Sequence, residues 1–266
     1  MPITRKRNPM LLGALSILVL VARGGSAAEP ENGALRVLVF SNAGWYRHPE
    51  IPRTNGWLVR IGQEKGWTVD VTETPGDLNP DRLAAYKVLV LNNANELGKV
   101  LNDAQKTAIA AWFRKGNGIV GLHAATVHQK GWPWLNELAG ADFDSDSDFS
   151  RARLVVDTGA KDDPAVKGQG AEFFYSADWH NHDQSVTGRP GFRVLLRLDE
   201  STFTPVRPYF QERGGKPMGK DHPAAWTHED QGGRFFYTEL GHDLRSVDTP
   251  FGRQHVSAAV SWAAGR

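Results

Sequence analysis

The feature that most constrains the fold is a regular alternation of short apolar runs and amphipathic segments between residues 35 and 125. Runs such as LRVLVFSNA and YKVLVLNNA are typical of strands buried on both faces of a parallel sheet. The intervening segments have apolar residues at helical spacing. The expected strands are 35–43, 67–73, 86–94 and 117–125, and the clearest helices are 53–65 and 101–116. This succession predicts right-handed crossovers and therefore a doubly wound, mainly parallel α/β sheet.

The second half of the chain is less regular. Residues 140–190 are rich in Asp, Ser and Gly and are interpreted as an irregular insertion that carries one strand, 151–157. Further strands are expected at 192–199, 224–229 and 233–240, and a closing helix at 250–265. The turn sequence DQGG joins the last two strands and predicts an antiparallel hairpin. No internal repeat or long linker divides the chain, so residues 29–266 are expected to form one domain.

The N-terminal residues have the pattern of a secretory signal peptide. TRKR (4–7) precedes an apolar run at 10–22, and the small residues Ser26 and Ala28 suit a cleavage site. We therefore expect residues 1–28 to be removed and the protein to be periplasmic or extracellular. The apolar run is shorter than the roughly 20 residues of a membrane span, so no membrane-embedded segment is expected after cleavage.

Charge and composition exclude several classes of function. Removing residues 1–28 takes away four basic residues and no acidic ones, which changes the formal net charge from +1 to −3. No basic stripe remains that would bind nucleic acid. The chain has no cysteine, which excludes thiol nucleophiles and thiolate metal ligands. The G-x-S-x-G, Walker, G-x-G-x-x-G and H-E-x-x-H motifs are also missing, which argues against serine hydrolases, NTPases, nicotinamide enzymes and common zinc proteases.

Three of the nine histidines follow the ends of predicted strands. His48 follows the first strand, His123 lies in GLHAAT, and His242 follows GRFFYTEL in TELGHD, beside Asp243. Functional groups of such sheets gather at the carboxyl ends of strands, so the three imidazoles are expected to share one crevice. The alternative is that His123 is a core residue and the others are exposed loop residues.

The segment WHNHD offers a candidate metal site. His180 and His182 lie two residues apart, so an extended backbone points both rings to one face. With Asp178 they could bind a divalent metal such as zinc. The alternative is an ordinary polar loop. Separately, Trp45, Tyr46 and Trp226 are candidates for the apolar wall of a sugar site, although Trp226 could equally fill the core.

Several motifs together resemble the ThuA-like family, named for trehalose utilisation. They are the first strand with RHPEIP, GIVGLHAAT followed by WPWLNELAGADF, HPAAWTHEDQGGRFFYTELGHD, and the terminal SWAAG. The resemblance covers nearly all of residues 35–265. It implies a flavodoxin-like variant of the class I glutamine amidotransferase architecture, in which GLHAA occupies the turn of the nucleophilic cysteine. Because His123 stands there, glutamine-hydrolysing thiol chemistry is not expected.

The resemblance also implies a role in carbohydrate metabolism, with His48, His123 and His242 as the matching positions. The chain departs from the family pattern at ADWHNH, where many members carry a DEWY-like segment, and at residues 144–148, which are Asp-rich where members carry a histidine. These departures affect the expected metal role of Asp178, His180 and His182.

Two hypotheses of function follow. The first is an exported enzyme of the hydrolase or isomerase type that acts on a sugar or glycoside. His48 and His123 would serve as acid/base groups or metal ligands, and His242 and Asp243 would complete the site. The second is a non-catalytic carbohydrate-binding or envelope scaffold protein on the same fold. Both imply a small-molecule carbohydrate partner, and neither defines the oligomeric state.

Overall fold

Alternating apolar residues in the first strands build the two layers of the core. In a computed structural model, which describes residues 1–2 and 33–266, Val37 and Val39 of the first strand face one side of the sheet, and Leu38 and Phe40 face the other. The strands are β1 Arg36–Phe40, β2 Thr68–Thr72, β3 Val88–Asn92, β4 Gly118–Leu122, β5 Phe143–Asp146, β6 Ser150–Val156, β7 Glu172–Ala177, β8 His180–His182, β9 Phe192–Asp199, β10 Pro223–Asp230 and β11 Gly233–Thr238.

Nine of these strands form one mixed sheet in the order β2-β1-β3-β4-β11-β10-β9-β6-β7. The pairs from β2 to β11 are parallel, and those from β11 to β7 are antiparallel. This confirms the predicted α/β class with a mainly parallel core and an antiparallel hairpin. The hairpin turns at Gln231 and Gly232, both with positive φ, as the DQGG sequence predicts.

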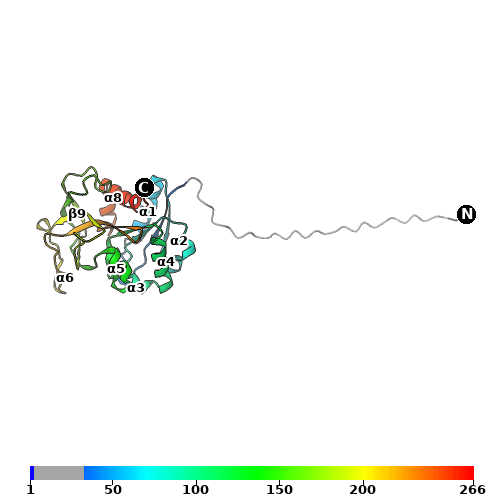
Figure 1. The fold of residues 1–266 in the computed structure, drawn as a ribbon, viewed down its shortest axis with the longest axis horizontal. Coiled ribbons are helices and arrows are strands. Elements are labelled where there is room, and N and C mark those ends of the chain that lie inside the picture. The colour runs from blue at the N-terminus through cyan, green and yellow to red at the C-terminus, as the bar shows by residue number, and fades with distance from the viewer. Residues whose placement is uncertain (3–32) are drawn as a thin grey trace. The chain divides into compact units, whose positions relative to one another are not determined.

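Helices cover both faces of the sheet (Figure 1). Apolar residues of α1 and α8 pack on one face, and those of α2, α4 and α5 pack on the other. The helices are α1 Ile51–Lys65, α2 Pro80–Leu83, α3 Leu97–Val100, α4 Asp103–Phe113, α5 Pro133–Ala139, α6 Pro208–Gln211, α7 Leu244–Val247 and α8 Pro250–Ala263. Short 3₁₀ turns lie at Pro75–Asp77, His123–Thr126, Gln129–Gly131 and Glu200–Thr202.

The insertion at 140–190 contains more strands than the sequence indicates. Besides β6, it holds β7 at the sheet edge and the pair β5 and β8, which form a small separate antiparallel sheet. β5 and β8 have the sequences FDSD and HNH, which lack the apolar alternation that identifies a strand. Their place is set by tertiary packing, and it brings β8 next to the carboxyl end of the main sheet.

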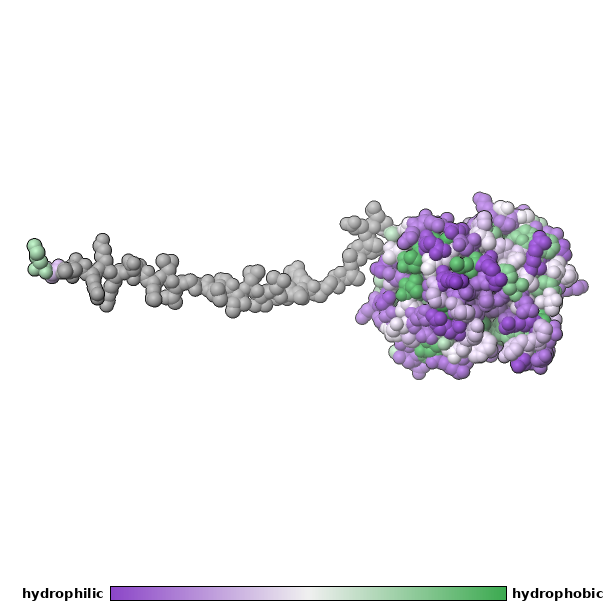
Figure 2. Space-filling model, turned by 180° about the vertical axis from the view of Figure 1, so that it is seen from behind, coloured by the Kyte–Doolittle hydropathy of each residue, from purple (hydrophilic) through white to green (hydrophobic). Residues whose placement is uncertain are grey.

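The face of the domain seen in Figure 2 is mainly hydrophilic, with hydrophobic residues in small separate groups. Among the described residues, no helix is both long and apolar enough to cross a membrane. The predicted secretory segment, residues 1–28, lies outside the described residues except for Met1 and Pro2. Residues Ala34–Arg266 form one compact unit.

Two glycines test the packing of the helices on the sheet. A Cβ at Gly118 would lie 2.2 Å from the carbonyl oxygen of Ala263 in α8, whereas a Cβ at Gly56 in α1 would meet nothing within 4 Å. We expect Gly118→Ala to lower the free energy of unfolding by about 1–3 kcal/mol through overpacking. Gly56→Ala should raise it by roughly 0.5–1 kcal/mol through helix propensity. Urea unfolding measures both, and equal effects would contradict this packing.

Candidate functional site

The three histidines that follow β1, β4 and β11 lie together at the carboxyl edge of the sheet. The ring centroids of His48 and His123 are 5.3 Å apart, those of His48 and His242 are 5.1 Å apart, and those of His123 and His242 are 4.9 Å apart. β1 and β4 are not adjacent, because β3 lies between them. The loop before α1 therefore carries His48 across the end of β3 to the other two rings.

The backbone around His123 explains why its ring lies at this edge. His123 has φ of 47°, a left-handed conformation that turns the chain sharply out of β4 into the 3₁₀ turn. Packing is close at two nearby glycines: a Cβ at Gly121 would lie 3.0 Å from Ala125 Cβ, and one at Gly241, whose φ is 126°, would lie 3.0 Å from Leu122 Cβ. The Tyr237 hydroxyl donates a hydrogen bond of 2.8 Å to the His123 carbonyl and fixes the turn.

Burial keeps His48 and His123 neutral. Desolvation, together with the neighbouring His242, lowers the pKa of His48 to about 3. Desolvation and the adjacent rings of His180, His242 and His48 hold the pKa of His123 well below its usual value. A neutral imidazole has a free lone pair and is the form that binds metals.

Hydrogen bonding directs the lone pairs. His123 Nδ1 lies 3.2 Å from the Glu239 carbonyl oxygen, which only accepts, so Nδ1 carries the proton and Nε2 is free to ligate. His242 Nδ1 lies 3.2 Å from Asp178 Oδ2, close enough for an ion pair, but it makes no hydrogen bond there. His48 Nδ1 is buried without a hydrogen-bond partner.

These rings fit a metal ion. Among the described residues, the three histidines are the one set of three His, Cys, Asp or Glu side chains whose ligand atoms all lie within 4.8 Å of one another. Imidazole nitrogen is a preferred ligand of zinc and of several other transition metals. The predicted ligand Asp178 contacts His242 instead. Among the described residues, Asp178, His180 and His182 do not come close enough together to form a group that could hold a metal ion.

The imidazoles lie at a cavity of about 410 Å³, a size typical of small-molecule sites. One side is an aromatic belt, which we define as Tyr46, Trp45, Phe143, Phe210 and Tyr209. Successive ring centroids along it are 6.3, 6.4, 5.4 and 4.9 Å apart. Phe143 and Phe210 are buried, whereas Trp45, Tyr46 and Tyr209 are about half exposed. The belt is therefore buried at its centre and exposed at both ends.

The polar wall of the cavity contains Asp146, Asp178 and Arg207. Desolvation raises the pKa of Asp146 to about 7, against the opposing charge of Arg207, whose Nε lies 2.5 Å from Asp146 Oδ1. A carboxyl that titrates near neutrality can donate and accept protons. Sequence reasoning did not select Asp146 or Arg207, and the Asp-rich run 144–148 gave no signal to separate Asp146 from its neighbours.

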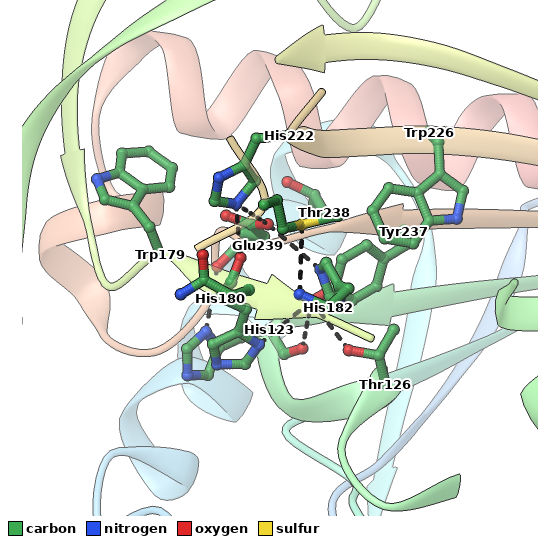
Figure 3. Close-up of polar contacts among 12 residues, drawn as sticks. His123, Thr126, Trp179, His180, His182, His222, Trp226, Tyr237, Thr238 and Glu239 are labelled. Atoms are coloured by element: carbon green, nitrogen blue, oxygen red, sulfur yellow. Dashed lines mark hydrogen bonds and ion pairs between the residues drawn. The ribbon is translucent and has the colours of Figure 1, made fainter. Parts of the chain in front are cut away.

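A buried layer of titratable groups lies next to His123 and His180 (Figure 3). The Glu239 carboxyl is fully buried, and its pKa is well above the usual value because of desolvation. His182 Nε2 is 3.4 Å from Glu239 Oε1, and burial lowers the pKa of His182 to about 3. His222 Nε2 donates a hydrogen bond of 2.7 Å to the His180 carbonyl, and His222 Nδ1 lies 2.8 Å from Glu200 Oε1. This layer fastens β8 to the main sheet.

The other predicted residues have mixed positions. His180 lines the cavity, with its ring centroid 4.0 Å from that of His123. His182 lines a different cavity, beside Met218. Asp243 caps α7, pairs with Arg245 and lies 3.6 Å from His242 Nδ1, but it does not line the cavity. Trp226 is fully buried and donates to the Ala139 carbonyl, so it belongs to the core and is not placed to contact a sugar.

The strand order and the helices on both faces define the chain as an α/β protein with a mainly parallel core and a histidine in the turn after β4. The chain belongs to the ThuA family, described as trehalose utilisation, whose model matches residues 36–263. Membership connects it broadly with carbohydrate utilisation. No curated protein sequence matches the chain.

Solved structures share the fold at low sequence identity. A ThuA-like protein of Bacteroides uniformis is 19% identical, with a TM-score of 0.68 over 90% of this chain and 95% of that one. A ThuA-like protein of Parabacteroides merdae is 16% identical, with a TM-score of 0.63 over 87% and 90%. A GMP synthase-like protein of Thermoplasma acidophilum is 13% identical, with a TM-score of 0.51 over 88% and 96%. These likenesses show the fold alone.

The buried histidines predict acid-sensitive stability. Burial lowers the pKa of six of them: His48, His123, His180, His182, His228 and His255. Below about pH 6.5 the unfolded chain binds protons that these folded side chains do not, so stability falls with falling pH. Burial raises the pKa of four acids, Asp142, Asp146, Asp178 and Glu239. These acids stabilise the folded chain as the pH falls, but they are fewer than the histidines.

We therefore expect the free energy of unfolding to fall between pH 6.5 and 5, on the order of 1–2 kcal/mol per pH unit. Urea unfolding at several pH values measures this slope. His255→Gln should reduce it, because His255 is buried with a pKa lowered to about 4. Stability that is flat, or that rises towards pH 5, would show that these imidazoles are not held neutral.

Proposed function

We propose that the protein is an enzyme that acts on a sugar or glycoside and holds a divalent metal between His48, His123 and His242. The observation that carries this proposal is the convergence of three imidazoles, two of them buried and kept neutral, at one end of a cavity lined by aromatic and carboxylate side chains. The family supports a carbohydrate substrate in general terms. The particular sugar, the metal and the reaction are part of the proposal.

The chemistry follows from the cavity's own residues. A divalent metal at the three histidines supplies Lewis acidity towards a substrate oxygen or water. Asp146 is placed to transfer a proton, because its pKa lies near neutrality. The Asp178 carboxylate lies beside His242 Nδ1, and Arg207, which pairs with Asp146, can donate hydrogen bonds to sugar hydroxyls. The aromatic belt offers flat apolar surface for the C–H face of a sugar ring.

Metal binding is the first test. We expect the purified protein to bind one Zn²⁺ or Co²⁺ per chain, and His123→Ala to lower the affinity at least about 100-fold because one of three ligands is lost. His228→Gln is the matched control, since His228 is also a largely buried imidazole with a lowered pKa but lies outside the cavity. Isothermal titration calorimetry measures both. Equal affinity in the parent and His123→Ala would refute the metal site.

The aromatic belt is tested with sugars. We expect Trp45→Ala to weaken binding of the best ligand from a panel of mono- and disaccharides, trehalose included, by roughly five- to tenfold through lost stacking. Phe174→Ala is the control, because Phe174 is 48% exposed but lies on the edge strand β7, outside the cavity. An equal loss in both variants, or no binding of any sugar by the parent, would argue against a carbohydrate site.

The same panel separates an enzyme from a pure binding protein. An enzyme should convert a bound sugar at a rate that falls sharply in Asp146→Asn, with little change in affinity. Unchanged sugar recovered from the parent, with affinity unaffected by His123→Ala, would favour the non-catalytic alternative.

A further inference from the structure

The loops that carry the cavity histidines are attached to the end of β3 and the residues after it, which do not line the cavity themselves. β3 lies between β1 and β4 in the sheet, and the segment 92–96, which begins with its last residue, contains three asparagines. Asn92, Asn93 and Asn95 are all fully buried. None of the residues 88–96 lines the cavity. A buried carboxamide is costly unless its polar atoms are bonded, so the partners of these side chains are informative.

The carboxamide of Asn93 contacts the loop that carries His242. Asn93 Nδ2 donates a hydrogen bond of 2.9 Å to the carbonyl of Gly241, the residue immediately before His242. The Asn93 backbone amide lies 3.3 Å from the carbonyl of Leu122, the residue immediately before His123, and donates to it. One residue therefore fixes the backbone next to two of the three imidazoles.

The carboxamide of Asn95 binds the loop that carries the third imidazole. Asn95 Oδ1 accepts from the backbone amides of Trp45 and Tyr46 at 3.1 and 3.3 Å, and Nδ2 donates to the Tyr46 carbonyl at 2.7 Å. The Asn95 carbonyl also accepts from the Gly44 amide at 2.9 Å. These bonds fix the chain two residues before His48 and hold Tyr46 and Trp45, one of the two exposed ends of the aromatic belt.

Asn92 extends the same pattern into α1. Its Nδ2 donates to Thr54 Oγ1 at 2.9 Å and to Asn55 Oδ1 at 2.8 Å. α1 begins three residues after His48, so this contact holds the loop from its other end. The His48 loop is thus bonded to the 92–96 segment on both sides of the histidine.

We propose that Asn93 and Asn95 are positioning residues that set the mutual geometry of His48, His123 and His242. Neither side chain lines the cavity, and both act through the backbone next to each imidazole ring. The inference rests on the proposed function where it concerns metal affinity, but the placement of the rings is testable without metal. Outer contacts of this kind typically change metal affinity about 10–100-fold when they are removed.

The main variant is Asn93→Asp. It keeps the shape and tolerates the φ of 55° at this position, but it places a carboxylate oxygen against the Gly241 carbonyl, where two acceptors repel. Asn93→Gly is the second variant, because glycine suits positive φ and simply removes the amide. Asn95→Asp tests the His48 loop. The control is Asn117→Asp, since Asn117 Nδ2 also donates to a backbone carbonyl, that of Trp112, at the opposite end of β4.

Two measurements on the full chain decide the proposal. Titration with Zn²⁺ and with Co²⁺, followed by calorimetry and visible absorption, should show affinity reduced about 10–100-fold and an altered Co²⁺ spectrum in the Asn93 and Asn95 variants. Asn117→Asp should remain within about twofold of the parent. Imidazole ¹H–¹⁵N NMR of the metal-free proteins should show shifted His123 and His242 signals in the Asn93 variants and shifted His48 signals in Asn95→Asp.

The outcomes separate the two proposals. If the parent binds no metal, the metal part of the proposed function is refuted. The positioning role is then tested by the imidazole NMR signals of the metal-free proteins. If folded Asn93 and Asn95 variants keep the parent's imidazole signals, or if Asn117→Asp shifts them equally, the positioning role is overturned. If all three variants unfold while Asn117→Asp is stable, the asparagines are structural determinants of the domain, and the specific role is likewise overturned.

Discussion

The candidate site depends on parallel pairing between β1, β3, β4 and β11. The carboxyl ends of parallel strands lie at one edge of the sheet, so the residues that follow these strands lie close together in space. The register pairs Phe40 with Leu91, Asn92 with Leu122 and Leu122 with Thr238. His48 follows Phe40 by eight residues, His123 follows Leu122 directly, and His242 follows Thr238 by four residues. Loss of this pairing would separate all three imidazoles at once.

Burial then determines the chemistry of the cluster. Several imidazoles within 4–5.3 Å of one another cannot all be protonated in a desolvated site, so His48 and His123 are held neutral. Desolvation has the opposite effect on acids: it raises the pKa of Asp146 to about 7 and holds the pKa of Glu239 well above its usual value. The same physical cause therefore supplies free nitrogen lone pairs on one side of the cavity and an exchangeable proton on the other.

The sequence predicts the parts of this arrangement that depend on local patterns. Apolar runs identify β1, β3 and β4, and DQGG identifies the hairpin, so the edge that carries the three histidines could be predicted. Asp146, Arg207 and the aromatic residues of α6 could not, because β5 and β8 lack strand periodicity and their positions depend on packing against distant elements. Trp226 shows the converse: an aromatic residue on an apolar strand gives no local sign of whether it faces a core or a ligand.

The residues that line the cavity are different from residues 92–96, which hold the cavity loops in place. This difference affects how the sequence of such a site can change in evolution. Side chains of the aromatic belt and polar wall belong to loops, β5 and α6, whereas the buried amide contacts belong to the segment after a central strand. Sequence change in the lining can alter which molecule is selected without disturbing the scaffold that aligns the imidazoles. Related chains could thus acquire different specificities over evolutionary time while retaining one reactive centre.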